Sequence, residues 1–289
     1  MVFLTFLGMF TNQYVPIWMK DNENKHMNQV IGQLSNLKSG IDMQILTSQA
    51  MVASSPIYSP IQLQADGVPI FASPTIGSLG FEGAKASGGA NASLNYTYYI
   101  AGKPYWLGNQ TGTVTGGTIE FVGPNRYFVQ QSVIYENGAI ILSQNDGEVV
   151  LAGISIKITP SGDSGYMVMI TFTSLIGSDK TIGGFGTKSI TTAVDYASRT
   201  TVNNSDPMPL TLSIFTKHGV AWSEYYNDTL RNSGIDVTDI NQGRVSNPVP
   251  EIAGGKATGY FTVIVVIENV ISVEFTKAVA SVAIADIGV

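Results

Sequence analysis

One short segment of the chain could present a nucleophile. In Gly162-Asp163-Ser164-Gly165 a serine stands in a sequence typical of a tight turn, and such a turn can expose a hydroxyl group. A serine acts as a nucleophile only with a histidine base and a carboxylate that orients the base. The chain has two histidines, His26 and His218, and no cysteine. Thiolate catalysis, disulfides and cysteine-based metal sites are therefore excluded.

The two histidines do not suit this serine. The segment resembles the nucleophile motif of chymotrypsin-like serine proteases, but Tyr166 stands where that family has a further glycine. His26 lies in a helical pattern without the protease context, and His218 follows Ser164, which is the wrong order for that family. The residues favour a plain β-turn, so we expect no catalytic residue and no enzymatic activity. An extracellular hydrolase with Ser164 as its nucleophile is a less favoured hypothesis.

Other chemical sites are weakly indicated. The carboxylate pairs Asp146 with Glu148 and Asp236 with Asp239 lack the spacing of an EF-hand, so exposed turn carboxylates are the simpler interpretation. The segment Gly183-Gly184-Phe185-Gly186 lacks the strand–turn–helix setting of a dinucleotide site. We expect no metal and no cofactor. The net charge of −6 also argues against a nucleic-acid partner, because an acidic surface repels phosphates.

The first nineteen residues are the most distinctive part of the chain, because they carry no charged side chain. A helix of this length spans about 28 Å, close to the roughly 30 Å hydrocarbon core of a bilayer. A signal remnant and an ordinary core helix are the alternatives, and a signal peptide would need a basic start and a small-residue cleavage site. We expect residues 1–19 to lie in a membrane or a filament core, kinked near residues 12–16 by Pro16. The predicted contact residues are Val2, Phe3, Leu4, Phe6, Leu7, Met9, Phe10, Tyr14, Val15, Ile17 and Trp18.

The helical pattern continues beyond residue 20 as an amphipathic helix. Apolar residues recur at spacings of three and four, and polar residues occupy the other face. The predicted apolar face consists of Met27, Val30, Ile31, Leu34, Leu37, Ile41, Ile45 and Leu46. Residues 1–50 are therefore expected to form one stem helix that joins an apolar environment to a folded head.

The rest of the chain, residues 51–289, reads as a β-rich head, because Gly, Pro, Ser and Asn separate short runs of Val, Ile, Tyr, Phe and Thr. The expected strands are residues 118–122, 126–135, 139–143, 149–158, 166–174, 209–216, 260–266 and 271–282. Asn137-Gly138 and Asn145-Asp146-Gly147 predict hairpin turns, which makes residues 126–158 an antiparallel meander. A short helix is expected around Val220 to Leu230, with Gly234 as its C-terminal cap.

Two features suit a head outside the cell. Five Asn-X-Ser/Thr sequences, all beyond residue 53, are candidate glycosylation sites at Asn91, Asn95, Asn109, Asn203 and Asn227. Unmodified turn residues are the alternative. Residues 83–117 also interleave Tyr and Trp with Gly, Ser, Asn and Thr, as a long loop or as edge strands. These aromatic residues could stack on sugars or belong to a sheet.

Two segments together resemble archaeal type IV pilin-like surface proteins. The first is Phe10-Thr-Asn-Gln-Tyr-Val-Pro-Ile-Trp-Met-Lys20 with the following stem, and the second runs from Asn125 to Gly153. The resemblance implies a single apolar N-terminal helix, a β-rich exterior domain, and a precursor whose short basic leader is cleaved.

We therefore expect a mainly β protein with a long N-terminal helix and an antiparallel β-sandwich or sheet head that contains one short helix. The predicted function is that of a structural subunit of an archaeal cell-surface filament, assembled through its N-terminal apolar helix, with an exposed β head that could serve in adhesion. Its partners would be copies of itself and, before or instead of assembly, the membrane. The alternative is a membrane-anchored module that binds a glycan or a surface protein and does not polymerise.

Overall fold

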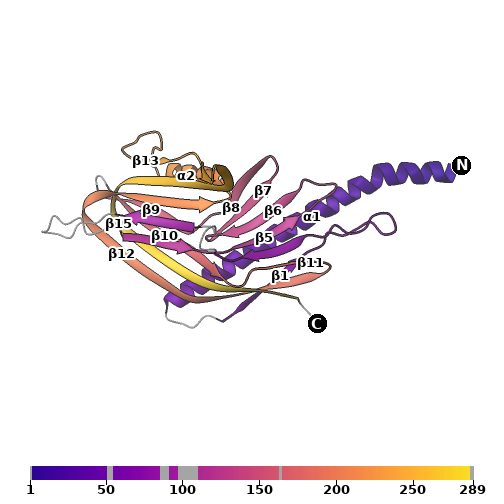
Figure 1. Ribbon diagram of the computed structural model, residues 1–289, viewed down its shortest axis with the longest axis horizontal. Helices are drawn as coiled ribbons and strands as arrows, with labels where there is room; N and C mark the ends of the chain where they lie inside the picture. The colour runs from indigo at the N-terminus through magenta and orange to yellow at the C-terminus, as the bar shows by residue number, and fades with distance from the viewer. Residues whose placement is uncertain (1, 51–54, 85–90, 97–109, 163–164, 287–289) are drawn as a thin grey trace.

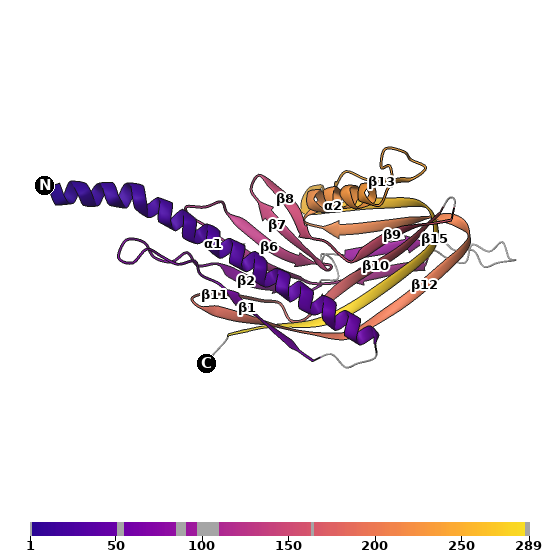
Figure 2. The same ribbon diagram turned by 180° about the vertical axis from the view of Figure 1, so that it is seen from behind.

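The computed structural model describes residues 2–50, 55–84, 91–96, 110–162 and 165–286. The protein is mainly β, with a long N-terminal helix and one further helix in the described part of the chain (Figure 1). The coarse fold expected from the sequence is thereby confirmed. The helix α1 (Val2–Gln49) crosses the head along one side and then projects beyond it at the N-terminal end (Figure 2).

The amphipathic part of α1 is built into the head. Six residues of its predicted apolar face are buried, and they are Met27, Val30, Leu34, Leu37, Ile41 and Ile45. They share a core with apolar residues from both sheets. Ile31 is only partly buried and Leu46 is 63% exposed, since each follows a buried residue and is turned about 100° away from the buried face.

One sheet has six strands in the described residues and is antiparallel throughout. Its order is β11 (Lys180–Gly183), β2 (Ser78–Glu82), β5 (Thr118–Gly123), β6 (Gln131–Glu136), β7 (Ala139–Gln144) and β8 (Gly147–Ala152). The expected meander corresponds to β6, β7 and β8. Its first turn has positive φ at both Asn137 (51°) and Gly138 (94°), the conformation that an Asn-Gly hairpin favours. The second turn connects β7 and β8 without a positive φ, so the two turns are of different types.

The other sheet has nine strands in the described residues. Its main path is β4 (Gln110–Thr115), β3 (Asn91–Tyr96), β12 (Thr187–Thr216), β15 (Lys256–Asp286), β10 (Gly165–Ile176) and β9 (Ile156–Ser161). The strand β1 (Ile57–Gln62) pairs with β12, while β13 (Gly243–Val245) and β14 (Val249–Ala253) pair with β15. The pairing of β10 with β15 is parallel, whereas the sequence predicted an antiparallel head.

Five strand predictions were wrong in their bounds, and one of them, residues 209–216, is only the last part of β12. Residues 126–130 precede β6 without joining the sheet, since their first backbone amides bond to a side chain of α1. Residues 149–158 divide into β8 and β9 at Gly153, where the ring of Tyr225 lies so close that a Cβ atom would clash with it. Residues 260–266 and 271–282 belong to one strand, β15, because Asn269 (φ 57°) makes a local irregularity within the strand rather than an end.

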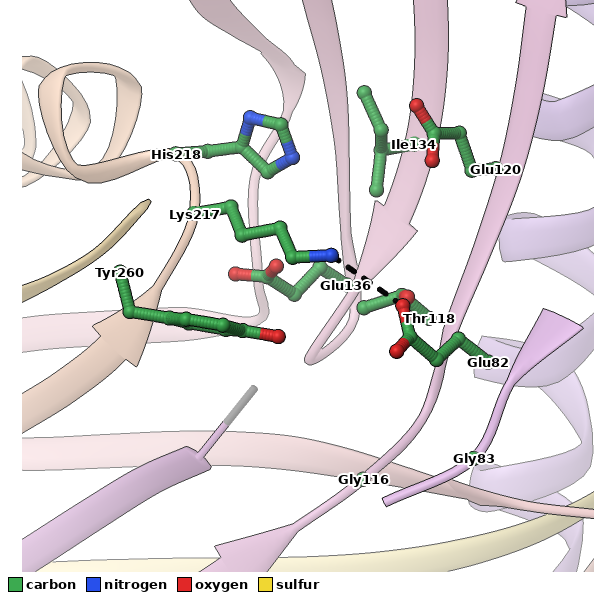
Figure 3. A pocket seen from close by; sticks show the side chains of 10 residues that line it. All are labelled: Glu82, Gly83, Gly116, Thr118, Glu120, Ile134, Glu136, Lys217, His218 and Tyr260. Atoms are coloured by element: carbon green, nitrogen blue, oxygen red, sulfur yellow. Dashed lines mark hydrogen bonds and ion pairs between the residues drawn. The ribbon is translucent and has the colours of Figure 1, made fainter. Parts of the chain in front are cut away.

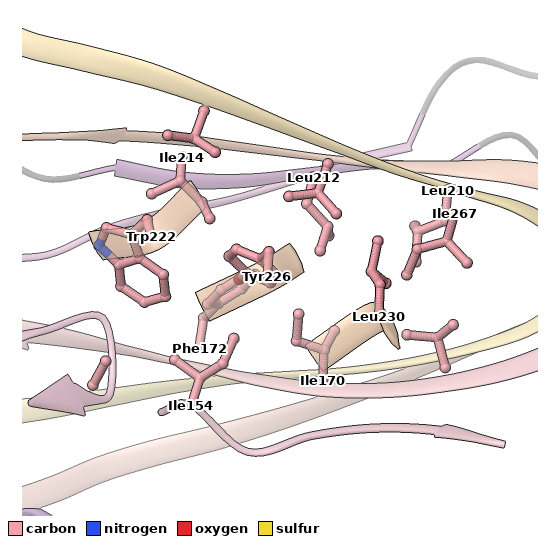
Figure 4. Packing of buried hydrophobic residues seen from close by; sticks show 14 of the residues in the cluster. Ile154, Ile170, Phe172, Leu210, Leu212, Ile214, Trp222, Tyr226, Leu230 and Ile267 are labelled. Atoms are coloured by element: carbon pink, nitrogen blue, oxygen red, sulfur yellow. The ribbon is translucent and has the colours of Figure 1, made fainter. Parts of the chain in front are cut away.

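The second helix, α2 (Gly219–Asn232), closes the other core. Its side chains Trp222, Tyr226 and Leu230 are buried, and Figure 4 shows them among strand residues such as Leu212 and Phe172. The helix ends as expected, with Gly234 in the left-handed region at φ 81°.

The buried face of α1 should dominate the stability of the head. We expect Leu34→Ala to lower the free energy of unfolding by about 2–5 kcal/mol, because it leaves a cavity in the core. Leu46→Ala on the same helix is the matched control and should change it by no more than about 0.5 kcal/mol. Denaturant unfolding measures both, and equal losses would show that α1 does not dock as described.

Candidate assembly site

The projecting part of α1 exposes an uncommon concentration of apolar side chains. Phe3, Met9 and Ile17 are 72%, 59% and 63% exposed, and Tyr14 and Trp18 are about half exposed. No charged residue lies among the first nineteen. The polar side chains of Asn12 and Gln13 are exposed as well, but exposed apolar side chains in this number indicate a site of interaction with another protein or with a membrane. We refer to residues 2–18 as the projecting segment.

Not all of the predicted contact residues face outward. Val15 is 5% exposed and packs with Met19 and Val68, so it contacts its own head and was wrongly assigned to an intermolecular surface. Phe10 and Leu7 are partly buried. The side chains of Val2, Leu4 and Phe6 lie outside what the structure describes.

Aromatic rings form a continuous row along one side of the projecting segment. The ring of Phe10 lies 5.7 Å from that of Tyr14 and 5.4 Å from that of Trp18. Residues spaced by four share a helix face, so the spacing 10, 14, 18 produces this row. The ring of Phe71, from the loop between β1 and β2, lies 5.2 Å from Phe10 and extends the row onto the head.

The projecting segment is helical but bent. α1 continues through Pro16, and its ribbon changes direction in the projecting part (Figure 2). Pro16 has no N–H group to donate to the carbonyl of Asn12, and the Oγ1 of Thr11 bonds back to the carbonyls of Leu7 and Gly8 at 2.9 and 3.1 Å. Both features weaken the regular helical bonding and favour a bend.

A buried carboxylate fixes α1 to the head a few residues after the end of the projecting segment. Glu23 is fully buried. Its Oε1 accepts hydrogen bonds from the Oγ1 of Thr75 (2.5 Å) and the amide of Arg126 (3.0 Å). Its Oε2 accepts bonds from the amides of Tyr127 (2.8 Å) and Phe128 (2.7 Å). A buried carboxylate is stable only when its oxygens are bonded in this way.

Neighbouring bonds brace the same junction. The guanidinium group of Arg126 donates to the carbonyls of Ser73 (3.0 Å) and Pro74 (3.2 Å). The Nε2 of His26 donates to the carbonyl of Gln62 at 2.8 Å, and burial lowers the pKa of this histidine. His26 is thus a structural residue of α1. The sequence analysis missed Glu23, although it lies four residues from both Met19 and Met27 on the buried face.

A second polar cluster joins α2 to the six-stranded sheet (Figure 3). The Nδ1 of His218 donates to Glu148 Oε2 at 2.9 Å, and Glu148 Oε1 accepts the amides of Val220 and Ala221 at the start of α2. Buried Glu136 accepts bonds from Thr216 (2.6 Å) and from the indole of Trp222 (2.8 Å). These contacts fix the first turn of α2.

The environment shifts the ionisation of this cluster. Burial lowers the pKa of His218, but its hydrogen bond to Glu148 and the charges of Glu136 and Glu148 outweigh burial, so its pKa lies above the usual value. Burial raises the pKa of Glu148, but bonds from His218 and two amides outweigh it and leave this pKa below the usual value. Burial raises the pKa of Glu136.

The pocket at this cluster does not suit a substrate. Glu82, Glu120, Glu136, Lys217, His218 and Tyr260 are among its lining residues (Figure 3). Its volume of about 20 Å³ has room for a single water molecule. Lys217 pairs with Glu82 at 3.3 Å and lies over the ring of Tyr260. In the described part of the chain, no group of three or more His, Cys, Asp or Glu residues is arranged to hold a metal ion.

The other candidate residues are dispersed. Asp236 and Asp239 bond mainly to nearby residues of their own turns. Asn203 is exposed on β12 and accepts a bond from Ser272, whereas Asn227 is partly buried in α2. Asn91 and Asn95 lie on β3. Asn109, Asp163, Ser164 and the aromatic residues of 97–109 lie outside the described residues, so the predictions for them stay untested.

No protein-family model, curated protein or solved structure matches this chain. Among the described residues, no helix combines the length and the apolar character that crossing a membrane requires.

The ion pair of His218 with Glu148 should make the free energy of unfolding depend on pH. A raised pKa means that the contribution of His218 is complete below about pH 6.5 and is lost as the pH rises through the folded-state value. The contribution of Glu148 is complete above about pH 4.3 and is lost as the pH falls through its lowered value. We expect His218→Gln to cost about 1–2 kcal/mol near pH 5.5 and much less near pH 9. Thermal unfolding at both values measures this, and a loss that is independent of pH would contradict it.

Proposed function

We propose that the protein is a structural subunit of a cell-surface filament of the archaeal type IV pilin-like kind, assembled through its projecting segment. One observation carries the proposal: the longer part of α1 is built into the head, and the projecting segment leaves the head with exposed apolar side chains. The stem and the β-rich head fit the pilin-like resemblance seen in the sequence.

Burial of apolar surface would drive the assembly. Each square ångström of apolar surface removed from water contributes about 25 cal/mol, before the cost of ordering the partners is subtracted. The projecting segment presents large side chains without charges, so copies can pack against each other with no unpaired charge buried at the contact. The buried part of α1 would then connect each of these contacts to the head.

The head would face outward in such a filament. In this proposal the protein is located at the cell surface as part of the filament. Asn203 would be more accessible to glycosylation than Asn227, because the side chain of Asn203 is exposed on β12 while that of Asn227 is partly buried.

The proposal predicts that polymerisation depends on the exposed apolar side chains of the projecting segment. We expect the triple variant Phe3→Ser, Met9→Ser, Ile17→Ser to weaken self-association at least a hundredfold without unfolding the head. The matched control is Ile240→Ser, Val249→Ser, Ile252→Ser, which removes three comparably exposed apolar side chains from the head.

Sedimentation velocity and electron microscopy of the purified protein measure this difference. Filaments formed by the control but not by the first variant would support the proposal. Dispersed particles of the unmodified protein at all concentrations would contradict it and would favour the anchored binding module. Equal loss in both variants would show that the effect is not specific to the segment.

A further inference from the structure

The loop between β1 and β2 exposes apolar side chains at its tip. We call residues 67–75 the apical loop, and none of them is charged. The side chain of Ile70 is fully exposed at 102%, and that of Phe71 is 40% exposed. Both Figures 1 and 2 show the loop between β1 and β2 at the end of the head from which α1 projects.

The backbone of the apical loop holds Ile70 in a strained conformation. Its φ of 72° lies in the left-handed region, which a β-branched residue rarely adopts. The amides of Val68 and Ala72 each bond to the carbonyl of the other, at 3.0 and 2.9 Å, and lock the turn. A glycine or an asparagine would adopt this backbone conformation with less strain. The isoleucine therefore lowers the local stability of the loop while it exposes an apolar side chain.

The apical loop is also fixed against the projecting segment. Phe71 contacts the ring of Phe10, and Val68 packs with Val15 and Met19. At the base of the loop, Thr75 bonds to Glu23, and the side chain of Arg126 bonds to the carbonyls of Ser73 and Pro74. The tip of the loop therefore lies against the projecting segment, beside Phe10.

The position of the apical loop along α1 favours a protein partner over a lipid bilayer. Phe10, which contacts the loop, lies eight residues from Trp18, or about 12 Å along the helix. If the segment entered a bilayer up to Trp18, the loop would enter the hydrocarbon with it. Irregular backbone exposed to lipid is not tolerated at that depth, because its carbonyl and amide groups have no partners there.

We infer that the apical loop is a second self-association contact, in which Ile70 packs against the exposed face of the projecting segment of a second copy of this chain. This inference rests on the proposed assembly through that segment. The segment offers the matching chemistry, since Phe3, Met9 and Ile17 are exposed and no charge interrupts them. The open surface around Ile70 consists of loop residues that include Gly67, Phe71 and Pro74, none of them charged.

The variant Ile70→Asn tests the contact, because asparagine tolerates the left-handed backbone and lacks the apolar side chain. We expect an unchanged or higher Tm and self-association weakened at least tenfold, which is about 1.4 kcal/mol. The matched control Ile240→Asn removes an isoleucine that is 66% exposed elsewhere on the head and should leave association unchanged. Sedimentation velocity over a concentration series measures all three proteins.

A comparison with the triple variant and a measurement of vesicle binding separate the ways in which the inference can fail. If Ile70→Asn associates as the unmodified protein does while the Phe3, Met9 and Ile17 variant does not, the loop contact is wrong and the proposed function stands. If neither variant weakens association, both are wrong. Flotation with phosphatidylcholine–phosphatidylglycerol vesicles gives the lipid arm: weaker vesicle binding by Ile70→Asn with unchanged association would assign the tip to lipid and overturn the inference.

Discussion

The buried carboxylate of Glu23 is the contact on which the arrangement of this molecule depends. It lies on α1 at the boundary between the docked and projecting parts, and its two oxygens accept four hydrogen bonds from the segments around Thr75 and 126–128. Loss of these partners would leave a buried charge unsatisfied, which costs far more than the loss of an ordinary hydrogen bond. The helix therefore cannot slide along the head, and the start of the projecting segment is fixed.

This fixed junction links the packing of the head to its proposed role. The buried stripe from Met27 to Ile45 supplies the free energy that holds α1 in place, and the bonds of Glu23 select its position along the helix axis. The same bonds order the apical loop through Thr75, so the loop and the projecting segment are positioned together. The apical loop and the base of the projecting segment are therefore held in place before copies associate, which reduces the ordering cost of that contact.

Periodicity and turn residues predicted those elements that depend on local sequence alone. The stripe on α1, the Asn137-Gly138 hairpin and the cap of α2 at Gly234 were all predicted because local sequence determines them. The sequence did not reveal where distant segments meet. A strand was predicted for residues 126–130, but their amides bond to Glu23, more than a hundred residues away. The burial of Val15 against Val68 was missed for the same reason, and so was the parallel pairing of β10 with β15.

The division of α1 into a docked part and a projecting part can be measured directly by amide hydrogen exchange at low and high protein concentration. In the dilute monomer, the account predicts strong protection from Met19 to Ile45 and rapid exchange over residues 2–14, since solvent-exposed helix ends open easily. At concentrations where copies associate, residues 2–14 should become protected while the docked part stays unchanged. Protection of residues 2–14 that is already complete in the dilute monomer would contradict the account.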